Sequence, residues 1–369
     1  MASRDATFEL EADRLALYDY PLDGVRIAAV PSPERDASRL LVHERATGTT
    51  RHAVFSELTE LLAPGDLLVL NDTRVVPARL LARRKSGGRV EVLLHPTGHP
   101  TWQPTEPTGR NRSDDPDVVL ALLAPSARVK AGERLLFDGA LEVEVVDPPG
   151  AELRRVRVHG GVEAAFRAGR LALPPYLPRE PDEPELPLDR ERYQTVYASR
   201  PGAIAAPTAG LHFTLPLLER LQARGVAVAR ITLHVGPGTF LPVRTERLSQ
   251  HAMHEELYEI DEAAAAAIAR TRARGGRVVA VGTTTTRALE SAAGAAGVEP
   301  GRARTRLMIR PPHDFRAIDA LITNFHLPRS TLLALVCAFV GRERLLALYS
   351  EAAALRYRFY SYGDAMLLL

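Results

Sequence analysis

The strongest constraint on the fold is a change in the rhythm of apolar residues near residue 160. From Asp66 to His159 the chain carries short alternating runs, beginning with DLLVLND and ending with LRRVRVHG, separated by glycine, proline and aspartate. Alternation with a period of two, without a helix-length pattern between the runs, is typical of a small antiparallel barrel or sandwich. We therefore predict an inserted β-barrel domain over residues 58–164.

Helical and strand patterns alternate in the C-terminal part of the chain. An amphipathic segment at 215–224 precedes the strand VAVARITLHV, and Asp261 can cap a helix that ends at two glycines. RVVAVG is a second strand, 286–296 is helical, and ALITNFH is a third strand before two C-terminal helices. This order predicts a layered α/β catalytic domain formed by residues 1–57 and 165–369, and therefore a two-domain α/β protein.

Two segments lack apolar periodicity. Residues 97–117 are rich in proline and polar residues, and residues 178–190 are acidic and rich in proline. Such compositions bury too little apolar surface to order themselves, so we expect disorder in the first segment and a solvated connector in the second.

Composition restricts the class of protein. With 369 residues, 46% of them hydrophobic, the chain can form two cores. The N-terminus has no apolar stretch and the longest apolar run, Leu332–Val340, is too short to cross a bilayer, so we expect no membrane association and a cytoplasmic location. The only cysteine, Cys337, excludes an internal disulfide and a multi-cysteine metal site, and we expect a buried, inert thiol. A net charge of +2 means that any RNA site must be a local patch.

Polar blocks stand where apolar runs stop. IAAPTAGLHF (204–213) and ITLHVGPGTFLPV (231–243) combine glycine, threonine and a histidine at such points. Glycine lets the backbone approach a ligand, and histidine exchanges protons near neutral pH. These blocks predict a catalytic pocket at strand ends.

A third block, VVAVGTTTTRALES, runs from a strand through Gly282 into a helix. The first backbone N–H groups of a helix lack internal partners and can bind a carboxylate. Capping of the helix by Thr283 or Thr284 is the competing interpretation. No GxGxxG follows an early strand, so the usual dinucleotide crevice has no support.

The block HAMHEE suggests a metal site. On a helix, His251 and His254 would share a face with Glu255 beside them. The HExxH spacing is absent, however, and a cap at Asp261 places this block before its helix. A metal-dependent hydrolase and a non-catalytic RNA-binding protein remain the alternative hypotheses.

The densest basic stretch surrounds the turn KSGG in the predicted barrel and could bind RNA phosphates; it comprises Arg79, Arg83, Arg84, Lys85 and Arg89. A solvated hairpin tip is the competing interpretation. Three aromatic residues could stack on bases, namely Tyr193, Tyr197 and Phe213.

From about Tyr18 to the C-terminus, these and further blocks together resemble the S-adenosylmethionine:tRNA ribosyltransferase-isomerase family of queuosine biosynthesis. The further blocks are LNDTRVVPARL (70–80), LPPYLPR (173–179), RYQTVYA (192–198), HAMHEELYEI (251–260), GTTTTRALES (282–291), LITNFHLPRSTLL (321–333) and YRFYSYGDAM (357–366). Several blocks in one order are far more specific than any single motif.

The resemblance implies a two-domain fold and a definite reaction. The ribosyl group of S-adenosylmethionine is transferred to 7-aminomethyl-7-deazaguanine at the wobble position of tRNA and isomerised, which gives epoxyqueuosine-tRNA and releases adenine and methionine. Such a reaction needs a base near C5′ and an acid near adenine. We expect S-adenosylmethionine as co-substrate, the anticodon loop of tRNA as partner, no metal, and a monomer.

We predict that the catalytic groups are His212, His234, His254 and Glu255, because imidazole suits both proton-transfer roles. The predicted substrate-binding residues are Thr208, Gly210, Gly236, Gly238, Thr239, Gly282, Thr283, Thr284, Arg287, Asn324, His326 and Asp364. His326 is also a reserve for proton transfer. Arg287 could pair with the methionine carboxylate, Asn324 could read a base or ribose edge, and Asp364 could hold the cationic aminomethyl group.

The chain departs from the family pattern in two places. Residues 97–117 look like an insertion, and RPPHDF (310–315) replaces a glycine and an aromatic residue. Pro312 fixes φ and changes the local loop. The blocks that carry the proposed catalysis are unaltered, so we expect activity to be retained.

Overall fold

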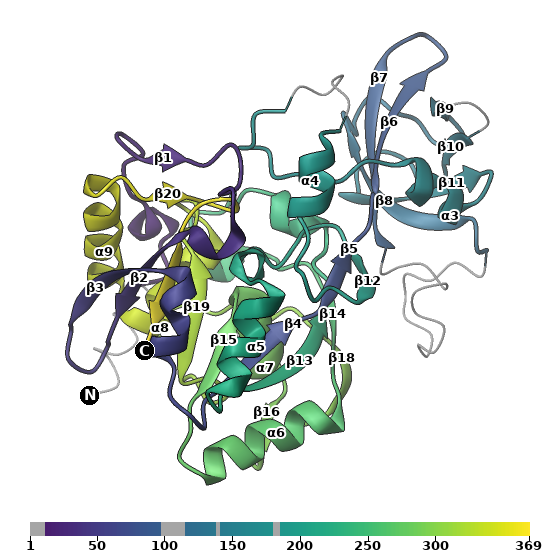
Figure 1. Ribbon diagram of the computed structural model, residues 1–369. Helices are drawn as coiled ribbons and strands as arrows, with labels where there is room; N and C mark the ends of the chain where they lie inside the picture. Colours follow the sequence, from purple (N-terminus) through teal and green to yellow (C-terminus); the bar gives the residue numbers. More distant parts are fainter. Residues whose placement is uncertain (1–11, 97–114, 138–140, 180–184) are drawn as a thin grey trace, which may run out of the picture.

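The computed structural model describes residues 12–96, 115–137, 141–179 and 185–369. Two parts are evident, a layered α/β part and a closed β-barrel that lies to one side of it (Figure 1). This arrangement confirms the predicted fold class. The predicted disordered segment 97–117 lies outside the described residues, except for its last three positions.

A mixed sheet forms the middle layer of the α/β part. In the described ranges it has nine strands, in the order β18 (Gly301–Thr305), β14 (Glu256–Ile260), β13 (Ala227–Leu233), β4 (Leu67–Asn71), β15 (Val278–Val281), β19 (Ala320–Asn324), β21 (Ala365–Leu368), β2 (Arg39–His43) and β3 (Thr50–Val54). β13, β4, β15 and β19 run parallel. Their carboxyl ends therefore meet at one edge of the sheet, where ligands of open α/β sheets bind.

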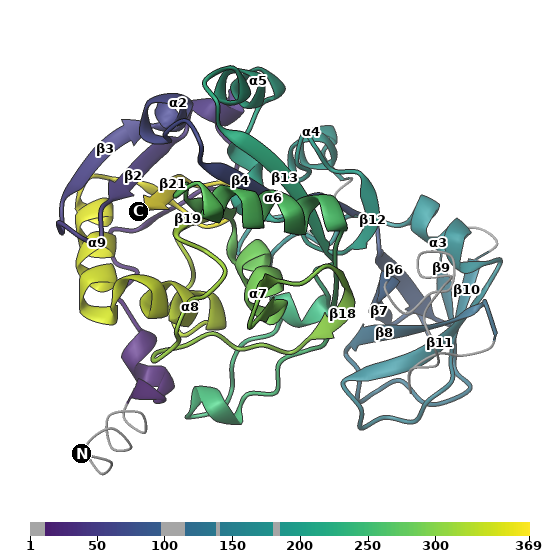
Figure 2. The ribbon, with the colours of Figure 1, turned by 90° about the horizontal axis from the view of Figure 1, so that it is seen from below.

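Alternate residues of the central strands face opposite helical layers. Leu68 and Leu70 pack in a cluster with α2 (Leu58–Leu61) and α5 (Leu215–Ala223), whereas Leu67 and Val69 pack in another. The second cluster includes α6 (Glu262–Ala273), α7 (Thr283–Ser291), α8 (Thr331–Val340) and α9 (Arg342–Ala354). Figure 2 shows α2 and α5 on one side of the sheet and α7 and α8 on the other.

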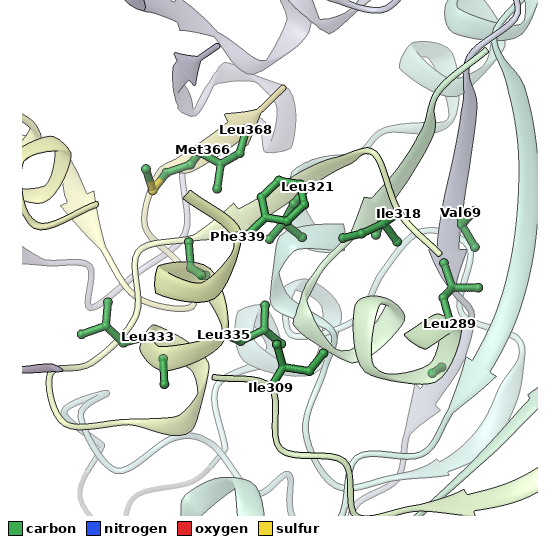
Figure 3. Close-up of a cluster of buried hydrophobic side chains, with 14 of the residues drawn as sticks. Val69, Leu289, Ile309, Ile318, Leu321, Leu333, Leu335, Phe339, Met366 and Leu368 are labelled. Carbon is green, nitrogen blue, oxygen red and sulfur yellow. The ribbon is translucent and has the colours of Figure 1, made fainter. Parts of the chain in front are cut away.

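The core beneath α7 and α8 is densely apolar. Figure 3 shows Val69, Leu289, Leu321 and Phe339 within it. Full burial of such a side chain contributes about 1.5–3 kcal/mol to stability. Cys337 belongs to the same cluster, and burial raises the pKa of its thiol to about 12, which confirms the prediction of a buried thiol.

The barrel closes in the strand order β10 (Leu141–Val145), β11 (Leu153–His159), β8 (Val118–Ala124), β7 (Arg89–Leu94), β6 (Arg79–Arg84) and β9 (Arg134–Phe137). All of its pairings are antiparallel. Closure removes free sheet edges. The predicted antiparallel barrel is therefore confirmed.

One run was wrongly predicted to be a barrel strand. DLLVLND forms β4, which lies between β13 and β15 in the large sheet. All five residues of β4 are buried, because helices cover both faces of this part of the sheet. A continuous apolar run is the signature of a buried parallel strand, and LLVL fits that signature better than alternation.

The second half of the predicted connector is structured. Residues 187–192 form α4 (Pro187–Arg192), in which Asp189 is only 1% exposed. Its carboxylate accepts hydrogen bonds from Arg179 and from the hydroxyl of Tyr362. Residues 187–190 are therefore part of a helix that Asp189 anchors, while residues 186–188 and 190 stay exposed as expected of a solvated connector. Residues 180–184 lie outside the described ranges.

Helix boundaries agree with the sequence patterns in most places. The Asp261 side chain caps α6 by accepting a hydrogen bond from Ala264 N, as predicted, and two helices precede the final strand. The helix predicted at 286–296 begins earlier, at Thr283, and ends at Ser291. Among the described residues, no helix is both long and apolar enough to cross a bilayer.

Candidate active site

A cavity of about 450 Å³ lies at the carboxyl edge of the parallel strands. Residues after β13, β15 and β19 line it, together with segments near 176, 207 and 360. The glycines permit close packing here: a Cβ on Gly238 would lie 2.6 Å from the His254 ring. The blocks of glycine, threonine and histidine therefore meet in space, although they are far apart in the sequence.

Ten predicted site residues line this cavity, namely Thr208, Gly238, Thr239, His254, Gly282, Thr283, Thr284, Arg287, Asn324 and His326. Six do not, namely Gly210, His212, His234, Gly236, Glu255 and Asp364. Three of the four predicted catalytic residues thus stand outside the lining, and only His254 is within it.

Arg287 and Glu256 form a buried ion pair in the cavity wall. Nη1 of Arg287 donates to the Glu256 carboxylate, and Nε donates to Leu307 O over 2.9 Å. Gly236 N donates to the other Glu256 oxygen over 3.2 Å. Nη2 of Arg287 is buried and has no hydrogen-bond partner. An unpaired guanidinium N–H group in a cavity is a donor ready for an anionic ligand.

Asn324 is the last residue of β19, and Gly282, which precedes α7, donates from its backbone N to Ile322 O in the same strand. Its Nδ2 lies 3.2 Å from His212 Nε2 and 3.3 Å from Tyr360 O, and its Oδ1 is buried without a partner. His212 stacks on Phe55, with ring centroids 5.1 Å apart. His212 therefore does not line the cavity itself but contacts Asn324, which does.

Three histidines line the cavity directly: His251, His254 and His326. His326 Nε2 lies 2.7 Å from Thr323 Oγ1, and burial lowers the pKa of this ring to about 4. His254 Nε2 lies 3.0 Å from the Glu152 carboxylate, which belongs to the connection between the barrel strands β10 and β11. The barrel thus contributes a charged group to the edge of the cavity.

The block LNDTR organises the strand ends. Asn71 donates from Nδ2 to Leu233 O and to Thr284 Oγ1, and its Oδ1 accepts from Leu233 N. Asp72 accepts from the hydroxyls of Thr232 and Ser199, each over 2.6 Å. Asn71 therefore orients a cavity-lining threonine. Asn71 is not among the site residues predicted from the sequence, although its position at the end of an apolar run was the available signal.

Glu256 is a second cavity residue that was not predicted from the sequence. It is the first residue of β14, directly after the predicted Glu255. Glu255 pairs instead with Arg304 and Arg306 on the surface side. Side chains alternate between the two faces of a strand, so a shift of one residue separates the cavity from the surface.

The carboxylate of Asp364 is engaged in contacts within the protein. It is 1% exposed and accepts hydrogen bonds from the backbone N–H groups of Arg39 and Arg358, with both guanidinium groups nearby. This arrangement anchors β21 to β2 and to the preceding turn. The structure does not place Asp364 where it could hold an aminomethyl group.

His251, His254 and Glu255 do not converge on a common point where they could bind a metal ion. The segment 251–255 is not helical, and Glu255 turns towards arginines while His254 pairs with Glu152. Across the described part of the chain, no group of three histidine, cysteine or carboxylate side chains has the spacing of a metal site.

The basic stretch forms the hairpin between β6 and β7, with the turn at residues 85–88. Arg83, Lys85 and Arg89 are exposed. Arg84 is paired with Glu133 at 2.6 Å, and Arg79 with Glu91 at 2.8 Å. These two arginines are therefore committed within the barrel.

The three aromatic residues predicted to stack on bases are buried. Phe213 is 0% exposed and packs edge-on against Phe55, and Tyr197 is also in that core. Tyr193 is 1% exposed and packs against Tyr362, although it contributes to the cavity lining. The stacking prediction is wrong for Phe213 and Tyr197, because their faces are covered by protein.

The divergent segment 310–315 is attached to the helix that lines the cavity. Glu290, near the end of α7, accepts hydrogen bonds from Arg316 N and Ala317 N and pairs with His313 at 3.5 Å. These hydrogen bonds help to lower the pKa of the buried Glu290 carboxyl. The loop is thereby anchored on the side that follows Pro312.

Comparisons with known proteins agree on one family. The family described as "Queuosine biosynthesis protein" matches residues 15–368. The S-adenosylmethionine:tRNA ribosyltransferase-isomerase of Anaeromyxobacter dehalogenans (strain 2CP-C) is 54% identical over 360 residues, which cover 96% of this chain and 99% of that protein. The protein of the same name from Gloeobacter violaceus is 52% identical, with 95% of each chain covered.

A solved structure gives the same result for the fold. The crystal structure of the S-adenosylmethionine tRNA ribosyltransferase from Thermotoga maritima shares 36% identity and a TM-score of 0.53, and the match covers 96% of this chain and 100% of that one.

Proposed function

The chain belongs to the queuosine biosynthesis protein family, and we propose that it is an S-adenosylmethionine:tRNA ribosyltransferase-isomerase. It transfers the ribosyl group of S-adenosylmethionine to 7-aminomethyl-7-deazaguanine at the tRNA wobble position and isomerises it. The products are epoxyqueuosine-tRNA, adenine and methionine.

The observation that carries this proposal is the unpaired Nη2 of Arg287 in the cavity wall. It lies on α7, whose first residues, Thr283 and Thr284, also line the cavity. A buried guanidinium donor beside a helix N-terminus favours a carboxylate, and the methionine end of S-adenosylmethionine carries one.

Proton transfer falls to the histidines in the lining. The sulfonium of S-adenosylmethionine acidifies the C5′ hydrogens and makes methionine a leaving group, so the protein must supply a base near C5′ and an acid near adenine. His326 is neutral at physiological pH, because burial lowers its pKa, and a neutral imidazole can accept a proton. His254 is the second candidate, and its Nε2 lies 3.0 Å from the Glu152 carboxylate. His212 and His234, which do not line the cavity, move from catalytic to supporting roles.

The tRNA partner fits the exposed basic hairpin of Arg83, Lys85 and Arg89. Phosphate neutralisation by such residues supplies most non-specific RNA affinity. We further propose that the protein is a cytoplasmic monomer, which size-exclusion chromatography with light scattering would check. The chemistry needs no metal because the sulfonium itself activates the substrate, so activity should persist in excess chelator.

One assay tests the proposed function. The purified protein is incubated with S-adenosylmethionine and tRNA carrying the aminomethyl base, and adenine release is followed together with the mass of the modified nucleoside. Stoichiometric adenine and epoxyqueuosine are expected, and tRNA carrying guanine at that position is the matched control. Adenine release that does not depend on the aminomethyl base would contradict the proposal.

A further inference from the structure

The amide of Asn324 is locked in one orientation. Its Nδ2 faces His212 Nε2 at 3.2 Å and Tyr360 O at 3.3 Å. A carbonyl oxygen can only accept, so the neighbour of Tyr360 O must be the NH2 group. His212 is 3% exposed and burial lowers its pKa to about 3, so its ring is neutral and Nε2 can accept the second N–H. A hydrogen bond with the backbone of Arg35 engages the ring as well.

This fixed orientation leaves Oδ1 of Asn324 as a hydrogen-bond acceptor without a partner. Both amide hydrogens of Asn324 are used within the protein, while Oδ1 is buried without a partner on a residue that lines the cavity. Burying an unsatisfied carbonyl oxygen costs about 1–3 kcal/mol, so a ligand that donates a hydrogen bond to this atom would be stabilised.

The chemistry of the site restricts the donor. An asparagine that recognises adenine uses one N–H and its oxygen together, but here no N–H is left for that pairing. A cation is also disfavoured, because burial and, after it, the positive charges of Arg358 and Arg35 lower the pKa of His212 beside Asn324, so the surroundings of the amide disfavour positive charge. Neutral donors that need no second contact from the amide satisfy both restrictions, and the ribose hydroxyls of a nucleoside are such donors.

We propose that Asn324 Oδ1 accepts a hydrogen bond from a ribose hydroxyl of the nucleoside co-substrate, and that His212 is the positioning residue that holds the amide in the required orientation. This inference rests on the proposed function, because the ribose belongs to S-adenosylmethionine. It gives the buried His212 a role in ligand selection that does not involve proton transfer.

The test is calorimetric titration of S-adenosylmethionine and its 2′-deoxy and 3′-deoxy analogues. tRNA with guanine at the wobble position is present, so that the anticodon site is filled without turnover. In the wild-type protein, removal of the contacting hydroxyl should weaken binding about tenfold, the effect of one missing hydrogen bond. In Asn324→Ala the same deletion should cost nothing further. In His212→Phe, where Tyr360 O is the remaining partner of the NH2 group and the amide is held less firmly, the cost should shrink to about threefold or less.

Phe55→Leu is the control for a loss of packing around His212. It replaces the ring that stacks on His212 but removes neither partner of the Asn324 amide. It should lower the melting temperature and keep the full tenfold discrimination. The proposal would be overturned if each deoxy analogue lost as much affinity in Asn324→Ala as in the wild-type protein. It would also be overturned if Asn324→Ala lost discrimination only against an analogue that lacks the 6-amino group. Failure of the wild-type protein to bind S-adenosylmethionine would overturn the proposed function as well, so the two failures are distinguishable.

Discussion

The hydroxyl of Thr73 lies 2.8 Å from Nδ1 of His234, and neither residue lines the cavity. The contact joins β5 (Thr73–Val75) to the end of β13, and the His234 ring also packs against Gly202, where a Cβ would lie 2.8 Å away. Burial, with Arg302 and Arg200 nearby, lowers the pKa of His234 to about 4. His234 is therefore a neutral histidine that holds strand ends together.

His234→Ala should act on stability more than on chemistry. Loss of the hydrogen bond and of packing should reduce the free energy of unfolding by about 1–3 kcal/mol. Adenine release by the folded variant should fall less than tenfold. Urea denaturation and the adenine assay measure the two effects. A hundredfold loss of activity with unchanged stability would return His234 to the chemistry.

Arg287 should determine affinity for the carboxylate of the co-substrate. Replacing Arg287 alone would leave the Glu256 charge buried and unpaired, which is strongly destabilising, so the informative variant is Arg287→Gln combined with Glu256→Gln. S-adenosylmethionine should bind about 10- to 100-fold more weakly, because a charge-assisted hydrogen bond is worth about 1.5–3 kcal/mol. Binding of decarboxylated S-adenosylmethionine should be unchanged. Equal losses for both ligands would place the carboxylate elsewhere, and Arg306→Gln on the surface is the matched control.

Sequence patterns predicted those parts of the fold that depend on local rules. The alternation of apolar and polar residues over 79–159 predicted the barrel, and the capping residue Asp261 predicted the start of α6. The central strand β4 was misassigned because its neighbours β13 and β15 come from the distant end of the chain. Its burial on both faces is a tertiary property that a short window cannot show.

The sequence predicted which segments form the site but not how their side chains are arranged. Resemblance and residue type selected Arg287, Asn324 and His326 as site residues, and all three line the cavity. Neither resemblance nor residue type could distinguish Glu255 from Glu256, because strand register decides which of two adjacent carboxylates faces inward. Nor could they show that His212 lies behind the cavity lining and contacts Asn324, since that contact joins segments 112 positions apart.

The basic hairpin should contribute to tRNA binding through charge. Arg83→Glu combined with Lys85→Glu should weaken tRNA affinity, and it should reduce the slope of log affinity against log salt by about 0.7–0.9 for each phosphate that the protein no longer neutralises. Filter binding across a salt series measures both quantities. Arg270→Glu with Arg274→Glu, on and just after α6, makes the same change in net charge and should have little effect. Equal effects of the two double variants would indicate a non-specific charge effect.

Stability should fall as pH is lowered from about 6.5 towards 4. Burial lowers the pKa of His212 to about 3 and those of His95, His234 and His326 to about 4. The unfolded chain takes up protons below its ordinary histidine pKa of about 6.5 while the folded protein does not, so acidification favours unfolding. Each such histidine costs up to about 1.4 kcal/mol per pH unit between its two pKa values. Urea denaturation at pH 7.5, 6.0 and 5.0 measures this loss, and a flat profile would show that these rings become protonated in the folded state.

Proton abstraction from C5′ should depend on the histidines of the cavity lining. His326→Gln can keep a hydrogen bond to Thr323 but cannot exchange a proton, and His254→Gln removes the second candidate. Loss of a general base typically costs about a hundredfold to ten-thousandfold in rate, so at least one of these variants should show that loss while its tRNA affinity stays near the wild-type value. His52→Gln, which removes a partly exposed histidine paired with Glu351, is the matched control and should be fully active. With S-adenosylmethionine dideuterated at C5′, the modified tRNA formed by the wild-type protein should have lost deuterium at the corresponding carbon. Retention of both deuterons would exclude a mechanism through C5′ deprotonation, and normal turnover by both glutamine variants would exclude these two histidines as the base.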